Sequence, residues 1–234
     1  MRKQTIELIN NFTSLFFPHL CLACGIEAPP LGADICTTCE ATLPLSHYHQ
    51  SKENPFTERF WGRLLIHTGA AMYLYARQSR VARLIHNLKY KGRKEVGLLL
   101  GERYGHSLKR EPHFQEADCI VPVPLHWKKQ LIRGFNQSEM FGNGLSESLA
   151  IPCIADGLER LAHTSSQTKK SRHERLSNME GVFAVKKPQH LKGRHILLVD
   201  DVLTTGATLE MCANELLRLP DTTISMATIA IAIH

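Results

Sequence analysis

An acidic pair followed by a hydroxyl-rich loop is the part of the chain best suited to chemistry. Asp200 and Asp201 follow the apolar run 196–199, which is typical of a buried parallel strand. The loop after them contains Thr204, Thr205, Gly206, Ala207 and Thr208, and a helix is expected to begin near Ala207. Ligands of open α/β sheets bind at the carboxyl ends of strands, and loop and helix N–H groups favour a phosphate there. Because two carboxylates would repel that phosphate, we expect them to bind sugar hydroxyls, or a metal held through them. The pattern predicts a sugar-phosphate site.

Other phosphate-binding and acidic motifs fit this stretch less well. A Walker loop needs a lysine after its glycines, and a dinucleotide-binding turn needs G-x-G-x-x-G; neither is present. A response-regulator receiver carries its acidic pair near its start, whereas only 33 residues follow Asp201. An ordinary strand, turn and helix with solvated carboxylates stays open as an alternative.

Four cysteines have the spacing of a metal site. Cys21, Cys24, Cys36 and Cys39 form two C-x-x-C pairs with eleven residues between them, which is typical of a tetrahedral zinc site. Because protein would fill all four positions, the zinc is expected to be structural. The other three cysteines, Cys119, Cys153 and Cys212, lie in apolar segments and are expected to be core residues.

Composition indicates a globular protein that acts on a polyanion. Of 234 residues, 43% are hydrophobic, and the formal net charge is +6. Residues 77–110 hold ten Lys and Arg against two Glu, and residues 160–195 hold nine against two. Such concentration favours pyrophosphate, a phosphorylated sugar or nucleic acid, although solvated helix faces could have the same composition. No apolar run is long enough for a transmembrane segment and no signal-peptide core is evident, so we expect a cytoplasmic protein.

Hydrophobic periodicity predicts strands alternating with helices, which implies a largely parallel α/β sheet. Strands are expected at 69–75, 119–123, 196–199 and 224–233, and helices at 79–88, 94–108 and 137–150. A further amphipathic helix is expected at 4–17, a linker at 44–60, a basic loop after 123 and a mobile loop at 162–181. We divide the chain into a zinc module at 1–55 and a larger domain at 56–234.

Residues 199–209 resemble the phosphoribosyl pyrophosphate (PRPP) signature of type I phosphoribosyltransferases. The resemblance implies that Asp200 and Asp201 hold the ribose 2′ and 3′ hydroxyls as the catalytic pair, that residues 204–208 wrap the 5′-phosphate, and that Mg²⁺ accompanies PRPP. Cations are then needed for the leaving pyrophosphate. The candidates are Lys89, Lys91, Lys128, Lys129, Arg133, Lys169, Arg172 and Arg175, the last three on the mobile loop.

Further motifs narrow the resemblance to the ComF family of competence proteins. They are Lys89-Tyr90-Lys91-Gly92, Val121-Pro122-Val123-Pro124-Leu125, Arg133-Gly134-Phe135-Asn136-Gln137 and residues between Arg160 and Phe183, together with the N-terminal cysteines. The family combines a zinc finger with a phosphoribosyltransferase-type domain. It implies a role in natural transformation, with incoming single-stranded DNA and competence-machinery proteins at the inner membrane as partners.

Three functions stay open at this level. The chain could be a competence factor that handles single-stranded DNA and binds PRPP or a DNA 5′-phosphate. It could be an active transferase that couples PRPP to an amine or base, or a regulator that senses PRPP. No residue is positioned by sequence alone as the general base, and the acceptor is not identified.

Overall fold

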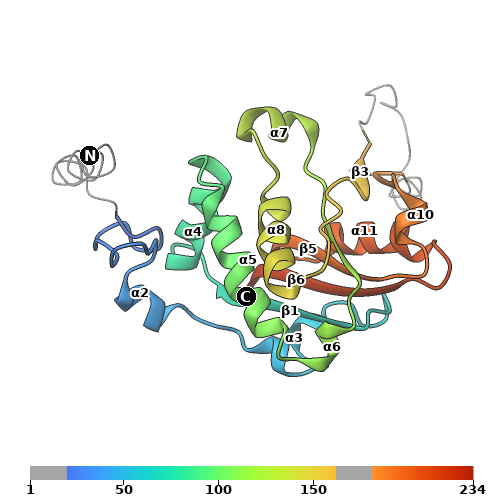
Figure 1. Ribbon diagram of the computed structural model, residues 1–234, viewed down its shortest axis with the longest axis horizontal. Coiled ribbons are helices and arrows are strands. Elements are labelled where there is room, and N and C mark those ends of the chain that lie inside the picture. The colour runs from blue at the N-terminus through green and yellow to red at the C-terminus, as the bar shows by residue number, and fades with distance from the viewer. Residues whose placement is uncertain (1–19, 162–180, 234) are drawn as a thin grey trace, which may run out of the picture.

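The computed structural model describes residues 20–161 and 181–233 of the chain (Figure 1). The strands are β1 (Thr68–Tyr75), β2 (Cys119–Pro122), β3 (Leu158–Arg160), β4 (Phe183–Val185), β5 (His195–Leu203) and β6 (Thr223–Ala232). The helices are α2 (Thr37–Thr42), the 3-10 turn η1 (Tyr48–Gln50), α3 (Pro55–Glu58), α4 (Arg80–Tyr90), α5 (Glu95–Leu108), α6 (Pro112–Gln115), α7 (Trp127–Arg133), α8 (Gln137–Leu149), α10 (Pro188–Leu191) and α11 (Ala207–Leu217).

Four strands form a parallel sheet in the order β1-β6-β5-β2, as the alternation of strands and helices predicted. In the register, Pro122 of β2 lies opposite Val199 of β5, and Asp200 lies opposite Thr228 of β6. The strands predicted at 69–75, 119–123, 196–199 and 224–233 are all present. Because the strands are parallel, the ends of β2 and β5 bring their following loops to the same edge.

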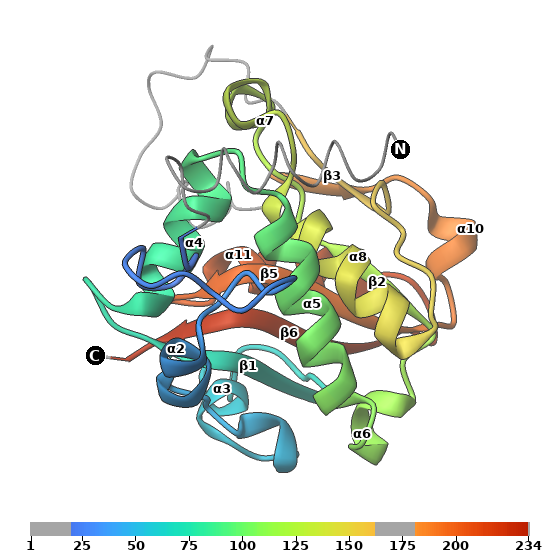
Figure 2. The same ribbon diagram turned by 60° about the vertical axis from the view of Figure 1, so that its left-hand side comes forward.

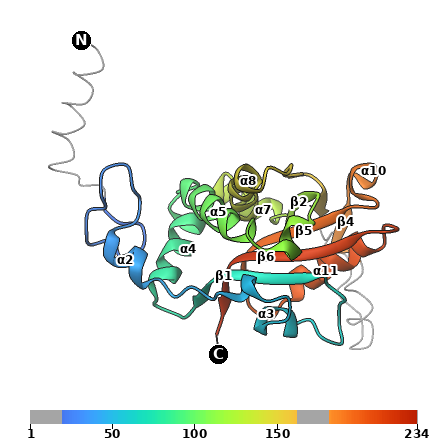
Figure 3. The ribbon, with the colours of Figure 1, turned by 60° about the horizontal axis from the view of Figure 1, so that its bottom comes forward.

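Helices cover both faces of the sheet (Figure 3). Leu197 and Val199 pack in the core under α4, α5 and α8, whereas Ile196 and Leu198 pack in the core with α3 and α11. All four side chains are fully buried. The uninterrupted apolar run of β5 is therefore explained by burial on both sides.

Helix α8 lies close beside α5 on one face of the sheet (Figure 2). A Cβ added at Gly101 of α5 would lie 2.2 Å from the Phe141 carbonyl oxygen, and one at Gly144 of α8 would lie 2.1 Å from the Leu98 carbonyl oxygen. Neither position can accept a side chain without moving a backbone. This contact fixes α8, whose first turn points at the end of β5.

The segment predicted as a linker is packed against the sheet. The Ser46 N–H donates to the Met72 carbonyl of β1 at 2.9 Å, and Leu45 forms an antiparallel bridge with Tyr73. Asn54 caps α3, and Phe56 and Phe60 are fully buried beneath the sheet. Periodicity could not reveal this packing because the buried positions are few and lie between polar residues. The division at 55/56 stays a prediction.

Two further local predictions were wrong or incomplete. The basic stretch after β2 forms helix α7, because it consists of good helix formers between a His126 cap and Gly134, whose φ of 79° ends the helix. The short antiparallel pair of β3 and β4 was not predicted.

Some predictions lie outside the described residues. They are the helix at 4–17 and the loop cations Lys169, Arg172 and Arg175. Within the described ranges, no helix combines the length and the apolar character that crossing a bilayer requires.

Candidate functional site

Asp200 lies half-buried at the end of β5, among donors from two elements. Its Oδ1 accepts a hydrogen bond from the Ser138 hydroxyl of α8 and another from the Asp201 N–H, both at 2.8 Å. Burial, together with the neighbouring Asp201 charge, raises the pKa of Asp200 to about 7. Near neutral pH this carboxyl therefore changes easily between its protonated and ionised forms.

Asp201 forms an ion pair with the last turn of α4. The Lys89 Nζ lies 2.9 Å from Oδ1 and 2.8 Å from Oδ2 of Asp201. The Lys89 side chain is 22% exposed and that of Asp201 is 14% exposed, so solvent screens this pair only partly. Lys89, which was predicted to contact the pyrophosphate, therefore contacts the acidic pair, although it is 112 residues from Asp201 in the sequence.

The loop between β5 and α11 encloses a small cavity. Its volume is 30 Å³, and it is lined by Asp200 and residues 202–209. Gly206 stands immediately before α11 with a φ of 85°, in the left-handed region that favours glycine. The first residues of α11 line the cavity, so the unpaired N–H groups of this helix N-terminus lie beside it. The helix is eleven residues long, which is enough to place a positive dipole end there.

Residues just before β1 support this loop from below. The Arg59 guanidinium donates to the Thr204 carbonyl at 3.2 Å and to the Ala232 carbonyl at 3.0 Å. A Cβ added at Gly206 would lie 3.1 Å from the Phe60 ring. Sequence reasoning missed both residues, although the Asn54-Pro55 cap followed by apolar side chains four residues apart was a signal for a short packed helix.

A second cavity, of 320 Å³, lies between the end of α4 and α7. Its lining residues are Lys89, Tyr90, Gly92, Lys129, Ile132 and Arg133. The Arg133 guanidinium lies 5.2 Å from the centroid of the Tyr90 ring and donates to the Gln137 Oε1 at 2.7 Å. Lys128 is not in this cavity; its ammonium lies 5.4 Å from the Trp127 ring centroid.

Three of the predicted cations thus meet in this second cavity, and two of those described do not. Lys89, Lys129 and Arg133 line it. Lys128 is exposed on α7, whereas Lys91 lines a separate groove beside the N-terminal module. The predicted pyrophosphate roles of all of these residues stay predictions.

The four N-terminal cysteines come together as a potential metal centre. All four sulfur atoms lie within 4.8 Å of one another, and Cys24 Sγ lies 3.9 Å from Cys36 Sγ. Tetrahedral zinc with Zn–S bonds of about 2.3 Å would space its sulfurs by roughly 3.8 Å. Burial acts to raise the pKa of the Cys21 thiol, but backbone hydrogen bonds from Cys24 and Cys36 lower it to about 6. The donor set fits a structural zinc ion, which would be held by Cys21, Cys24, Cys36 and Cys39.

The remaining cysteines behave as core residues, as predicted. Cys119 and Cys212 are buried and Cys153 is partly buried. Burial raises the pKa of Cys119 to about 11 and that of Cys153 to about 12. None of these thiols is suited to act as a nucleophile.

Sequence comparison with known proteins shows the family of this chain. The chain is 27% identical to Competence protein ComFC of Bacillus subtilis over 203 residues, covering 86% of the chain and 72% of that protein. It is 31% identical to DNA utilization protein YhgH of Escherichia coli (strain K12) over 227 residues, covering 87% of the chain and 93% of that protein. The chain belongs to the ComF family. This confirms the resemblance drawn from its motifs.

Other comparisons add less to the description of this ComF protein. Competence protein F of Haemophilus influenzae is 36% identical over 113 residues, which cover 47% of the chain and 49% of that protein. No family model matches the chain. A solved glutamine PRPP amidotransferase from B. subtilis aligns with 62% of the ComF chain and 30% of its own, at 18% identity and a TM-score of 0.44. A score this low carries no argument by itself.

Proposed function

We propose that this ComF protein binds PRPP at the acidic pair and handles incoming single-stranded DNA during natural transformation. One observation carries the PRPP part. Asp200 and Asp201 lie near the end of a buried parallel strand, and the loop that follows this strand leads to the N-terminus of α11. Carboxylates able to accept hydrogen bonds from the two ribose hydroxyls are thus followed by a helix N-terminus whose N–H groups can bind a phosphate.

In this proposal each group of residues holds one part of the ligand. Asp200 and Asp201 accept the ribose 2′ and 3′ hydroxyls, and residues 204–208 enclose the 5′-phosphate. Mg²⁺ would be held by PRPP oxygens with the acidic pair nearby, and it supplies charge neutralisation to the pyrophosphate. A ribose hydroxyl that binds Asp201 competes with Lys89 for the same carboxylate oxygens. A Lys89 ammonium displaced in this way can contact the pyrophosphate, beside Lys129 and Arg133 of the second cavity.

An active phosphoribosyltransferase of the amido or base type is the second candidate. The three cations of the second cavity favour it, because breaking the bond between C1 and the pyrophosphate oxygen leaves negative charge on the departing group. An acceptor nitrogen would form the new bond to C1 and give up a proton. Neither cavity is lined by a described Glu or His that could take this proton. A PRPP-sensing regulator would bind PRPP without this step.

Calorimetric titration of PRPP with Mg²⁺ tests the binding site. Wild-type protein should bind, and the variant with Asp200→Asn and Asp201→Asn should lose measurable affinity because its amides carry no charge. Asp156→Asn is the matched control, since Asp156 lies on the surface in an ion pair with Lys187. Retained affinity in the double variant, with folding intact, would contradict the ribose-hydroxyl role.

Pyrophosphate release separates the transferase from the alternatives. PRPP, Mg²⁺ and a panel of amines and bases are incubated with the protein, and release is compared with the double variant. Release that requires both an acceptor and the acidic pair indicates a transferase. Binding of PRPP with no release for any acceptor favours the competence factor or the regulator.

The DNA part of the proposal is supported by charge and by relatives. The names of the relatives refer to competence and to DNA utilization, and the stretch 77–110 carries eight more basic than acidic residues. Single-stranded DNA that binds through phosphate contacts should dissociate steeply as salt rises. An affinity that does not change with salt would contradict this mode of binding.

A further inference from the structure

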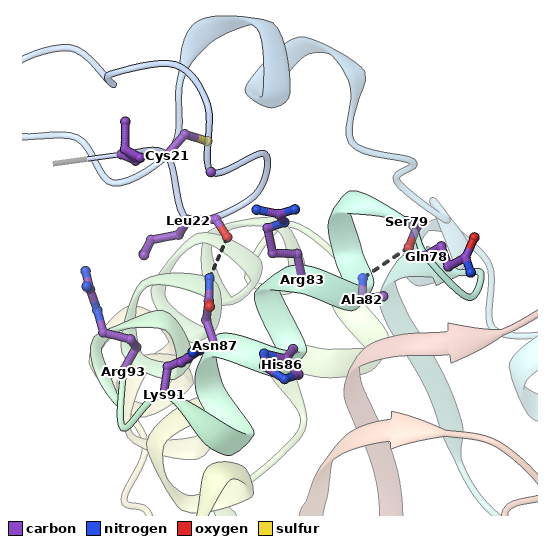
Figure 4. A pocket seen from close by; sticks show the side chains of 12 residues that line it. Cys21, Leu22, Gln78, Ser79, Ala82, Arg83, His86, Asn87, Lys91 and Arg93 are labelled. Carbon is purple, nitrogen blue, oxygen red and sulfur yellow. Dashed lines mark hydrogen bonds between the residues drawn. The ribbon is translucent and has the colours of Figure 1, made fainter. Parts of the chain in front are cut away.

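A further cavity, an open groove of 1140 Å³, lies between the N-terminal module and α4 (Figure 4). The module contributes residues 20–22 and Gly25, and the other wall comes from residues 78–93. The Asn87 amide of α4 donates to the Leu22 carbonyl at 2.8 Å and thereby joins the two walls. Small-molecule pockets usually measure about 300–1,000 Å³ and are mainly apolar. The size and openness of this groove favour a chain-like ligand.

The groove is lined by basic groups. Arg83, Lys91 and Arg93 line it together with His86, and no lining residue is acidic. Figure 4 shows Arg83 and Arg93 extending toward the module. Glu95 forms an ion pair with Arg93 and offsets part of its charge, but Glu95 is not among the lining residues. The surface is therefore complementary to a polyanion.

An exposed aromatic side chain lies between residues of the groove and residues of the second cavity. Tyr90 is 66% exposed, and its ring centroid lies 5.1 Å from that of His86 in the groove. Tyr90 also lines the second cavity, on whose other side α7 carries Trp127, which is 50% exposed. Alternating cations and exposed rings are typical of surfaces that bind unpaired bases.

We infer that this groove and the turn at Tyr90 form the track that binds single-stranded nucleic acid, with Arg83, Lys91 and Arg93 contacting phosphates and Tyr90 stacking on a base. The inference rests on the proposed function and assigns the binding of single-stranded DNA to this surface. Duplex DNA fits this surface less well, because paired bases are not available to stack on Tyr90. The track leads from the cysteine module toward the ion pair of Lys89 with Asp201.

Fluorescence anisotropy with a labelled oligothymidine of about 16 nucleotides tests the track on the full-length, zinc-loaded protein. Lys91→Gln should weaken binding at low salt by about three- to tenfold and reduce the slope of log affinity against log salt by about 0.7, the value for one lost phosphate contact. Tyr90→Leu should weaken binding, whereas Tyr90→Phe should not, because the phenyl ring still stacks. Lys192→Gln, an exposed lysine at the end of α10, is the matched control.

The outcomes distinguish this surface from the wider proposal. If wild-type protein does not bind the oligonucleotide, the nucleic-acid part of the proposed function fails and this inference fails with it. If wild-type protein binds but Lys91→Gln, Arg83→Gln and Tyr90→Leu bind equally well, only the track is wrong. Binding of polyglutamate in place of DNA, with the same sensitivity to Lys91→Gln, would assign the groove to an acidic protein and overturn the inference. Zinc content, measured for each variant, shows that the module is intact.

Discussion

Lys89 and Asp201 form a two-point ion pair, with the ammonium 2.9 Å and 2.8 Å from the two carboxylate oxygens. The pair joins the end of α4 to the end of β5. It also balances one of two adjacent carboxylates, the other of which, Asp200, is held by Ser138 and the Asp201 N–H. Among the described residues, Lys89 is the cation that forms an ion pair with this acidic pair.

We expect Lys89→Met to destabilise the protein by about 1–3 kcal/mol. Removing one partner of a fully buried pair costs roughly 3–5 kcal/mol, and partial exposure of both side chains reduces this. Asp201→Asn should cost less, because it also relieves repulsion with Asp200. Urea unfolding of both single variants and the double variant gives the coupling energy, which should be about 1–2 kcal/mol. A coupling near zero would show that the pair does not persist in solution.

Asp200 should make stability depend on pH in a particular direction. Its pKa is raised from 3.8 to about 7 on folding. Its contribution to the free energy of unfolding is therefore fully present below about pH 3.8 and is lost as the pH rises through 7. Asp200→Asn removes this loss. Relative to wild type, the variant should gain about 2–4 kcal/mol of unfolding free energy between about pH 4 and pH 8.

The measurement is urea unfolding of both proteins at the two pH values. Val202→Ala, in the same strand, changes no charge and serves as the control, so its difference from wild type should be equal at both pH values. An Asp200→Asn difference that stays constant with pH would contradict the raised pKa.

The sequence was most informative where local pattern and local function coincide. The apolar run of β5, Asp200 and Asp201, and the loop 204–208 are contiguous, so their arrangement follows from strand and helix signals alone. The C-x-x-C pairs were equally informative, because each short C-x-x-C turn brings its own two thiols together. The parallel order of the sheet followed from the alternation of elements.

Contacts between distant segments could not be read in the same way. Nothing near Lys89 in sequence indicates that it meets Asp201, and nothing separates it from Lys91, whose side chain lines a different cavity. Arg59 and Phe60 lie in a stretch with polar composition, yet they support the loop at Gly206. These relationships depend on how α3 and α4 pack on the sheet.

The packing of Phe60 against Gly206, in the loop between β5 and α11, leads to a third prediction. Gly206→Ala should destabilise the protein by about 1–2 kcal/mol, because alanine is strained at a φ of 85° and its methyl group would press on Phe60. The loss of PRPP binding free energy should exceed the loss of unfolding free energy, because the added methyl group displaces the loop that is proposed to hold the 5′-phosphate. Gly193→Ala is the control, because its φ is also positive at 68° but no atom lies within 4 Å of an added Cβ. Calorimetry and unfolding of both variants give the comparison; equal effects on PRPP binding would contradict the support by Phe60.

Removal of zinc should affect the module and its groove before the sheet. The Leu22 carbonyl accepts from Asn87, and Cys21 packs in the same core as α4, so loss of metal should increase hydrogen exchange in 21–39 and in the turn of α4 around Asn87. Cys36→Ser should reproduce the effect of a chelator, whereas Cys119→Ser should leave zinc content unchanged. We expect hydrogen exchange in β5 and β6 to be the same before and after chelation. Faster exchange in those strands would contradict a sheet whose stability does not depend on the metal.

PRPP and single-stranded DNA should influence each other's binding through the turn at the end of α4. Lys89 and Tyr90 line the second cavity, whereas Lys91 lines the groove, so a pyrophosphate in that cavity lowers the positive potential beside the DNA track. We expect PRPP with Mg²⁺ to weaken oligothymidine binding by about fivefold, at the lower end of typical couplings because the groove is open to screening solvent. Coupling is reciprocal, so DNA should weaken PRPP binding by the same factor. Lys89→Gln should reduce both effects together, and a change in only one of them would show that the two ligands do not communicate through this turn.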